Sequence, residues 1–215
     1  MFLSGAGGTT RGMVCLACHE VTSGRLCRRC EATLWPAPDR LIDGIRVVAG
    51  FEHQGAAKVM IHHLKYRGVI DLAGMVADRL EGRLPRVPLV PVPRALTRRV
   101  RYGVDPARVI AESLARRLGV PVIDALARPL HAPRRAGRDH SIRVAPFRLR
   151  RRLRFEVLVV DDVITTGATV KAAVDAIGVD LVRSITAANV VPEPSNLGSR
   201  VTGPKPGVDR VWQAF

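Results

Sequence analysis

The segment that constrains the fold most is an apolar run that leads into two aspartates and a threonine-glycine loop. Residues 155–160 read FEVLVV, a nearly continuous apolar run rich in valine, and Asp161 and Asp162 follow at once. Such a run predicts a parallel strand that is buried on both faces. The sequence TTGAT at residues 165–169 then opens a predicted helix over residues 170–177. This stretch therefore predicts a strand–loop–helix unit of an α/β sheet.

The residue types in this unit are suited to binding a sugar phosphate. Two adjacent carboxylates at the end of a core strand repel each other and lose hydration, a cost that a ligand or a donor must offset. Hydroxyls, a glycine and free amides at a helix N-terminus bind phosphate. Ligands of open α/β sheets bind at the carboxyl ends of the strands, where both groups would lie. Each feature alone has a more common explanation. A threonine-rich loop before a helix is more often only an N-cap, and an Asp-Asp pair more often lies in a solvated turn.

The rest of the chain alternates predicted strands and helices. Gly68 and Gly119 are predicted to end two of these helices, and Asp105 is predicted to cap a helix that begins at Pro106. A basic, aperiodic stretch over residues 128–154 predicts a loop with a hairpin arm. The alternation predicts a parallel sheet flanked by helices. The predicted strands are 46–51, 87–92 and 120–126, and the predicted helices are 57–66, 71–83 and 106–118.

All four cysteines fall in one short stretch near the N-terminus. They form two CxxC pairs separated by eight residues: Cys15, Cys18, Cys27 and Cys30. Four thiolates clustered in this way match a tetrahedral zinc site, and a small hairpin over residues 22–24 would return the chain. The alternative is a thioredoxin-like redox pair, which usually lies at a helix start within a βαβ pattern that is absent here. We therefore expect a small zinc-ribbon-like module over residues 13–34, held by a structural zinc.

The chain is strongly basic, with a formal net charge of +15 and a sequence pI near 11.2. Such a charge favours an anionic partner, for which single-stranded DNA is one candidate. Arginine-rich composition of a GC-rich genome is an equally good explanation, and the aromatic content of 4% counts against a dedicated single-strand binder. Local clusters are the places to test, and two stand out: Arg25, Arg28 and Arg29, and Arg148, Arg150, Arg151, Arg152 and Arg154.

No targeting or membrane signal is evident in the sequence. No apolar run approaches the roughly 20 residues that span a bilayer. The opening residues MFLSGAGGTTRG lack the basic region and the long apolar core of a signal peptide. We therefore expect a cytoplasmic protein that does not insert into a membrane.

Residues 157–169, VLVVDDVITTGAT, resemble the phosphoribosyl pyrophosphate (PRPP) signature of type I phosphoribosyltransferases. The wider layout is similar in order and spacing to the ComF family of competence-associated, phosphoribosyltransferase-like proteins. A four-cysteine module is followed by LKYRG at 64–68, VPVPR at 90–94, RYGVDP at 101–106 and then the signature. The resemblance implies a type I phosphoribosyltransferase-like domain over residues 40–193. Residues 195–215 lie outside it and are expected to be a disordered tail.

The resemblance also implies roles for individual residues. Asp161 and Asp162 would hydrogen-bond the ribose 2- and 3-hydroxyls of PRPP, and magnesium would arrive chelated by the pyrophosphate. A turn over residues 91–94 matches the pyrophosphate loop of the family. No catalytic base is assigned. The 5-phosphate would bind to Thr165, Thr166, Gly167, Ala168 and Thr169, and the candidate pyrophosphate contacts are Lys65, Arg67 and Arg94.

One segment departs from the family pattern. Residues 132–147 read APRRAGRDHSIRVAPF and keep the glycine of the family's loop element, but they lack its glutamine and asparagine. The flexible active-site loop of a type I transferase would lie here, so the departure bears on turnover rather than on binding.

Three hypotheses about function follow from the sequence. The first is a PRPP-binding phosphoribosyltransferase of nucleotide metabolism that transfers phosphoribose to an unidentified acceptor. The second is a DNA-binding accessory protein of competence, DNA uptake or repair, in which the PRPP pocket is regulatory. The third is a fold with a structural role only, against which the intact segment DDVITTGAT argues.

Overall fold

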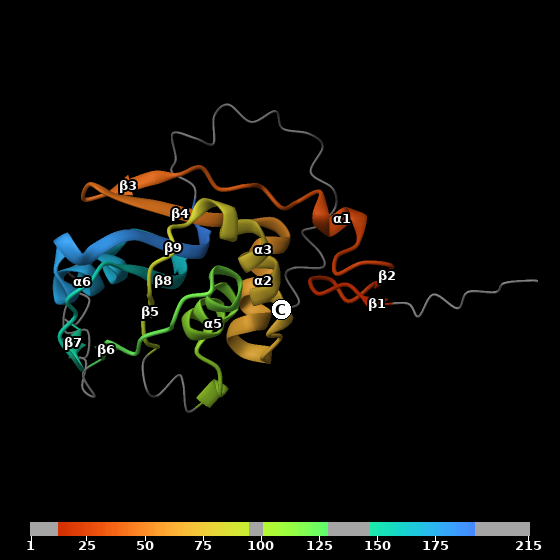
Figure 1. Cartoon of the computed structure of the whole chain (residues 1–215). Helices are drawn as coiled ribbons and strands as arrows, with labels where there is room; N and C mark the ends of the chain where they lie inside the picture. The colour runs from red at the N-terminus through yellow and green to blue at the C-terminus, as the bar shows by residue number, and fades with distance from the viewer. Residues whose placement is uncertain (1–12, 95–100, 129–146, 192–215) are drawn as a thin grey trace, which may run out of the picture.

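The computed structural model describes residues 13–94, 101–128 and 147–191 (Figure 1). The predictions for the arginine-rich loop up to residue 146 and for the tail at 195–215 lie outside the described residues. The described strands are β1 (Met13–Val14), β2 (Val21–Thr22), β3 (Arg40–Ile42), β4 (Ile45–Glu52), β5 (Leu89–Pro91), β6 (Leu126–Ala127), β7 (Arg148–Leu149), β8 (Val157–Ile164) and β9 (Val182–Val190). The described α-helices are α1 (Arg28–Glu31), α2 (Gly55–Arg67), α3 (Asp71–Leu80), α5 (Pro106–Leu118) and α6 (Ala168–Ile177), with 3₁₀ turns at Glu81–Arg83 and Val179–Leu181.

A five-stranded sheet in the order β3-β4-β9-β8-β5 forms the centre of the fold. The four strands β4, β9, β8 and β5 are parallel, as the sequence predicts, whereas β3 is an antiparallel edge strand that makes the sheet mixed. A tight turn with positive φ at Asp43 and Gly44 joins β3 to β4. The carboxyl ends of β4, β9 and β8 therefore meet at one edge of the sheet.

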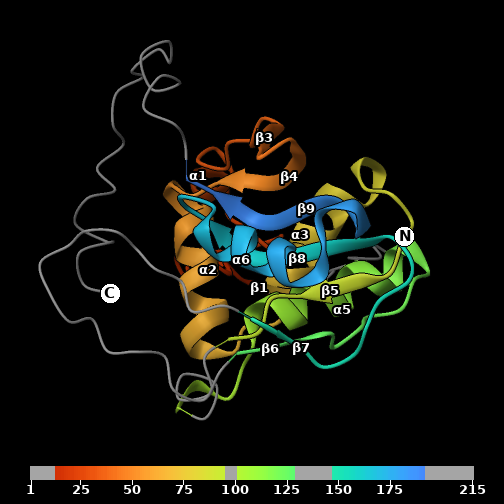
Figure 2. The same cartoon turned by 90° about the vertical axis from the view of Figure 1, so that its left-hand side faces the viewer.

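Helices cover both faces of the sheet. Figure 1 shows α6 on one side of β8 and β9 and the group α2, α3 and α5 on the other, and Figure 2 shows the same arrangement from the side of α6. Leu158 and Val160 of β8 pack in one hydrophobic cluster with α2, α3 and α5. Val157 and Val159 pack in a second cluster with α6. Strand β8 is thus buried on both faces, as its apolar run predicts.

Most predicted elements match the structure within two or three residues, and two differ in an informative way. Strand β8 continues past the aspartate pair to Ile164 instead of ending at the pair, so both carboxylates lie within the strand. The predicted strand over 120–126 is wrong for most of its length. Only Val122 forms a bridge to β5. Pro121 has no N–H group to extend the pairing before it, and the Ala125 backbone N–H after it donates to the oxygen of Ile123 instead.

The hairpin arm predicted for the basic stretch is present where the structure describes it, since β6 and β7 pair antiparallel. The predicted stops of two helices are also confirmed. Gly68 and Gly119 end α2 and α5 in the left-handed conformation. Asp105 stands at the N-cap position of α5, but its side chain makes no capping hydrogen bond and accepts one from the Arg94 backbone N–H instead.

The cysteine module packs on the outer side of α2, away from the sheet (Figure 1). Cys15 and Cys30 belong to the same hydrophobic cluster as residues of α2 and α3. Thr33 Oγ1 accepts a hydrogen bond of 3.0 Å from the Ala56 backbone N–H in the first turn of α2. The division into units 13–34 and 40–193 stays a prediction, but the two stretches share one apolar core.

Across the described residues, no helix is both long and apolar enough to cross a membrane.

Candidate functional site

The edge formed by the carboxyl ends of the parallel strands gathers the residues that the sequence singles out. The register aligns Glu52 of β4 with Val190 of β9, and Val190 with Ile164 of β8. In β8, Asp161 and Asp162 lie two to three residues before Ile164, and the threonine loop begins directly after Ile164. Helix α6 starts at the same edge.

The two aspartates lie on opposite faces of β8, because successive side chains of a strand alternate. Asp162 follows the face of Val160 and points toward α2, where its Oδ1 lies 3.0 Å from Lys65 Nζ. Asp161 follows the face of Val159 toward α6 and is only 8% exposed. Asp162 is therefore the more accessible carboxylate, and it already has a cationic partner.

Burial, reinforced by the neighbouring charge of Asp162, raises the pKa of Asp161 to about 7. The backbone N–H of Asp162 donates a hydrogen bond of 2.8 Å to Asp161 Oδ1 and partly opposes this shift. Near neutral pH the two carboxyl groups together therefore carry less than two negative charges. A ligand hydroxyl that donates to Asp161 would favour its charged form.

The threonine loop has the shape that an anion at a helix N-terminus requires. Thr165 and Thr166 are exposed, and Gly167 takes the N-cap position of α6 with a φ of 81°. The conformation favours glycine, and a Cβ atom on Gly167 would lie 2.9 Å from Ile42 Cδ1, so the Ile42 side chain would have to shift. No side chain of the N-cap residue caps α6. The Ala168 backbone N–H donates a long hydrogen bond of 3.4 Å to Thr166 Oγ1, and the next first-turn amides of the helix are the groups that can face an anion.

The three cationic candidates have different partners. Lys65 pairs with Asp162. The Arg94 guanidinium donates to the backbone oxygens of Lys65 at 2.9 Å and Val104 at 3.0 Å, which ties the C-terminal turn of α2 to the segment before α5. Arg67 lies 3.3 Å from His19 Nε2 on the cysteine module. Of the three, Lys65 is therefore the residue that contacts the aspartate pair. Arg94 stabilises the position of α2, the helix that carries Lys65.

Sequence reasoning missed one cation at this edge. Arg40 of β3 donates at 3.4 Å to the backbone oxygens of Thr165 and Val191, which places a guanidinium group beside the threonine loop. Its position depends on the β3–β4 hairpin, and β3 is not among the strands predicted from the sequence. The Asp-Gly pair at residues 43–44 is the signal that would have revealed this hairpin.

The four cysteine sulfurs lie together and could hold a metal ion. All four Sγ atoms are within 4.8 Å of one another, and those of Cys18 and Cys27 are 3.6 Å apart. Tetrahedral coordination at a Zn–S distance of about 2.3 Å would separate the sulfurs by about 3.8 Å, close to this value. The Cys27 backbone N–H also points at Cys15 Sγ, at 3.4 Å. Donor type, number and spacing all fit a metal.

The acidities of the cysteines indicate the same need for a cation. Burial raises the pKa of Cys15, but backbone N–H groups outweigh this effect and lower the pKa to about 7. Burial and the neighbouring cysteines raise the pKa of Cys30. Four thiols at this spacing cannot all ionise unless a positive ion compensates their mutual repulsion.

No protein-family model and no curated protein matches the chain. The chemistry of the site is therefore argued from its own groups: a carboxylate with a lysine partner, a second buried carboxylate, and an exposed threonine-glycine loop at a helix start. Together they can bind vicinal hydroxyls and a phosphate.

Proposed function

We propose that the chain binds PRPP at the carboxyl edge of its sheet and transfers the phosphoribosyl group to an acceptor. The observation that carries the proposal is the meeting of Asp162, Lys65 and the threonine loop at this edge, although they belong to separate elements. Each has the charge that its part of PRPP requires: a carboxylate for the ribose hydroxyls, a cation for pyrophosphate, and helix amides for the 5-phosphate.

The reaction needs positioning and charge stabilisation more than a nucleophilic side chain. The bond between ribose C1 and the pyrophosphate oxygen breaks, and pyrophosphate leaves with the electron pair. The acceptor then forms a bond to C1 and loses a proton. An oxocarbenium-like ribose separates the two events, so fixed charges around the ribose and the leaving group lower the barrier. Magnesium would enter chelated by the pyrophosphate oxygens.

We also propose that the cysteine cluster binds one structural zinc ion. The four thiolates would close a tetrahedral site and leave no open position for catalysis. The role of the metal would be to hold the module against α2, the helix that carries Lys65.

Titration of the protein with PRPP and magnesium, and separately with ribose 5-phosphate, tests the first proposal. The wild-type protein should bind both ligands. Gly167→Ala should lose most of the affinity for both, because it disturbs the loop assigned to their shared 5-phosphate. The strained φ and the contact with Ile42 should also lower the free energy of unfolding by about 1–3 kcal/mol.

Gly74→Ala is the matched control for this experiment. Gly74 lies in α3, and a Cβ atom there would meet nothing within 4 Å, so the control should bind like the wild type and be slightly more stable. An absence of PRPP binding by the wild-type protein would overturn the proposed function. Normal ribose 5-phosphate binding by Gly167→Ala would show that the threonine loop is not the 5-phosphate site.

A cluster of rings and guanidinium groups favours single-stranded DNA as a second candidate ligand. The ring centroids of Tyr66 and Tyr102, the only two tyrosines of the chain, lie 4.8 Å apart in a T-shaped contact. The Arg94 guanidinium lies 5.4 Å and 5.0 Å from the two rings, and that of Arg101 lies 5.4 Å from Tyr102. We call these four residues the tyrosine–arginine cluster. Aromatic residues are few in the chain, but its two tyrosines lie together.

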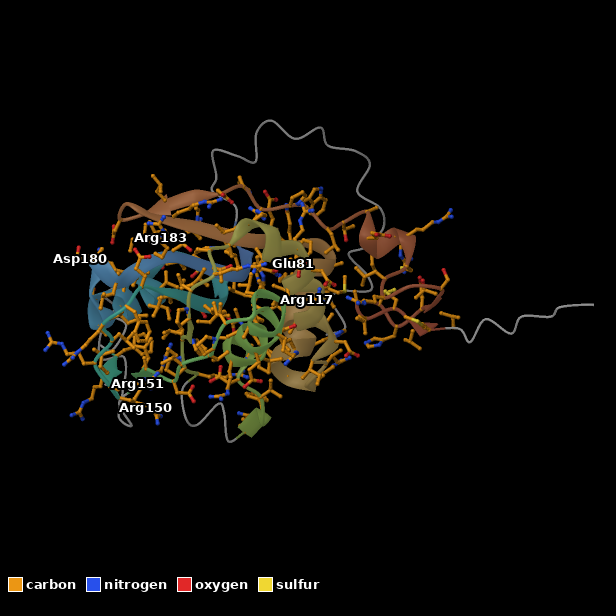
Figure 3. All side chains as sticks on the ribbon, in the orientation of Figure 1. Glu81, Arg117, Arg150, Arg151, Asp180 and Arg183 are labelled. Atoms are coloured by element: carbon orange, nitrogen blue, oxygen red, sulfur yellow. The ribbon has the colours of Figure 1, made fainter. Side chains whose placement is uncertain are left out.

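The cluster has the composition of a platform for unstacked bases. Tyr66 is 40% exposed and Arg101 is also exposed, so a base could reach the ring while a phosphate meets the guanidinium. His62 adds a ring at 4.7 Å from Tyr66. The arginine clusters singled out in the sequence do not form one surface with each other. Figure 3 shows Arg150 and Arg151 at the end of the molecule opposite the cysteine sulfurs.

We therefore expect Tyr66→Ala to weaken binding of single-stranded DNA about 5- to 100-fold, the loss of roughly 1–3 kcal/mol that one stacked base contributes. Wild-type affinity should fall with salt at a log–log slope of roughly −0.7 for each phosphate neutralised, and Tyr66→Ala should keep that slope. Fluorescence anisotropy with a labelled oligonucleotide across a salt series measures both quantities.

Arg150→Gln with Arg151→Gln is the contrasting variant, because it removes charge far from the rings. This variant should reduce the dependence of affinity on salt if the end of the molecule that carries Arg150 and Arg151 contacts DNA. It should leave that dependence unchanged if the DNA contacts the tyrosine–arginine cluster instead. Equal affinity of Tyr66→Ala and the wild-type protein would exclude the cluster as a stacking platform.

A further inference from the structure

A half-buried histidine at the end of β4 lies next to the proposed PRPP site and has no role in the functions proposed above. His53 directly follows β4, and its backbone N–H donates a 2.8 Å hydrogen bond to the oxygen of Val190 at the end of β9. Its ring is half-buried at the carboxyl edge of the sheet. The backbone position of His53 is therefore fixed, with β9 between it and the aspartates of β8.

A buried asparagine determines which ring nitrogen of His53 carries the proton. Asn189 is 1% exposed, and its Nδ2 lies 2.9 Å from the backbone oxygen of Ala57 and 3.2 Å from His53 Nδ1. A carbonyl oxygen can only accept, so the amide must turn its NH₂ group toward Ala57. The second hydrogen of that NH₂ group then points at His53 Nδ1, which must present a lone pair. A neutral His53 ring therefore carries its proton on Nε2.

The Nε2–H group of His53 remains available to a ligand. It makes no hydrogen bond to any residue in the described ranges, and it is not among their buried unpaired side-chain atoms. Burial, and then the charges of Lys65 and Lys58, lower the pKa of His53, whereas the charge of Asp162 acts in the opposite direction. The ring is therefore neutral at pH 7 and donates a hydrogen bond without needing an added proton.

Two features of the surroundings indicate which part of the ligand this donor meets. The threonine loop assigned to the 5-phosphate begins α6, whereas His53 is held by Asn189, whose amide is hydrogen-bonded to the backbone oxygen of Ala57 in α2. The charges of Lys65 and Lys58 also act on the ring, so an approaching acceptor is favoured when it is anionic. On the α2 side, the anionic part of PRPP is the pyrophosphate.

We propose that His53 is a contact residue of the PRPP site, and that its Nε2–H group donates a hydrogen bond to an anionic oxygen of the pyrophosphate. This inference rests on the proposed function and deepens it, because it assigns a neutral donor beside Lys65 to the leaving group. Asn189 is then a positioning residue that acts through the ring of His53.

Calorimetric titration with two ligands tests the proposal, because ribose 5-phosphate lacks the pyrophosphate. His53→Phe should lower the affinity for PRPP with magnesium by about tenfold or more, as expected for a lost hydrogen bond to a charged acceptor, and leave ribose 5-phosphate binding unchanged. His53→Gln can place an amide N–H near the position of Nε2 and should restore most of the PRPP affinity. Gly74→Ala, whose added Cβ atom meets nothing within 4 Å, is again the control and should bind both ligands normally.

Nuclear magnetic resonance of the wild-type protein gives a second measurement that does not depend on any variant folding. The ¹⁵N shifts of the His53 ring should identify the Nε2-protonated tautomer, and addition of PRPP should shift the Nε2–H signal. A ring protonated at Nδ1, or equal PRPP affinity of His53→Phe and the wild type, would overturn the proposal while the proposed function stands. A wild-type protein that binds no PRPP would overturn both.

Discussion

Loss of the metal from the cysteine module should unfold residues 13–34 and loosen α2, although no metal ligand comes from that helix. A structural zinc contributes about 10–16 kcal/mol of binding free energy to a small module, which is comparable with the whole stability of an ordinary domain, about 5–15 kcal/mol. The module has no apolar core apart from the one it shares with α2 and α3. Its loss therefore removes packing from the larger unit as well.

Contacts with α2 and with α3 would transmit this effect to the larger unit. The ring of the buried His63 lies with Nδ1 3.0 Å from the Leu16 backbone oxygen, between the first two cysteines. Thr33 Oγ1 accepts from the first turn of α2 at Ala56. Arg25 pairs with Asp78 of α3 at 2.9 Å, but this exposed ion pair contributes little. The helix so held carries Lys65, so removal of the metal should also weaken PRPP binding.

The measurement combines metal analysis with hydrogen exchange. Elemental analysis should find one zinc per chain in the wild-type protein and none in Cys15→Ser with Cys30→Ser. Exchange followed by mass spectrometry should show fast exchange of residues 13–34 and faster exchange of α2 in the variant. Thr22→Ala serves as the control within the same module and should retain the metal. It removes two long hydrogen bonds of the hydroxyl, one donated to the Leu26 backbone oxygen at 3.3 Å and one accepted from the Gly24 backbone N–H at 3.4 Å.

Two results would contradict this prediction. Metal-free wild-type protein with a Cys15–Cys18 disulfide would favour the redox alternative. Unchanged exchange of α2 in the metal-free variant would show that the shared core does not couple the module to the helix.

The sequence is sufficient for those parts of the fold that depend on local patterns. The apolar run of β8 predicts a strand buried on both faces, and the glycines at 68 and 119 predict two helix ends, because each pattern has its cause within a few residues. The spacing of the cysteines likewise predicts one cluster, since two CxxC turns can direct four sulfurs at one point.

Features that depend on distant partners could not be predicted in this way. Arg94 has the charge of a pyrophosphate contact, but its guanidinium is held by two backbone oxygens and two tyrosine rings from other segments. The tautomer of His53 depends on Asn189, which lies 136 residues further along the chain. Charge and spacing identify candidate residues, but tertiary packing decides which of them face the site.

The aspartate pair gives the clearest example, because two adjacent residues with identical side chains should respond differently to substitution. Asp162→Asn should lower the affinity for PRPP about 10- to 100-fold, since a hydrogen bond to a charged group contributes about 1.5–3 kcal/mol. It should change the free energy of unfolding little, because its ion pair with Lys65 is partly exposed. The double variant with Asp161→Asn should lose most of the affinity, and unchanged binding would reject the ribose assignment.

Asp161→Asn should instead alter how stability depends on pH. The pKa of Asp161 in the folded protein is about 7, above the ordinary value of 3.8, so the folded state holds a proton that the unfolded state releases between these values. The stability that this proton contributes is complete below pH 3.8 and is lost as the pH rises toward 7. Asparagine does not titrate, and it keeps the oxygen that accepts from the Asp162 backbone N–H. The variant should therefore gain stability relative to the wild type as the pH rises from 4 to 8. Urea unfolding at several pH values measures this difference, and a constant difference would show that Asp161 titrates normally.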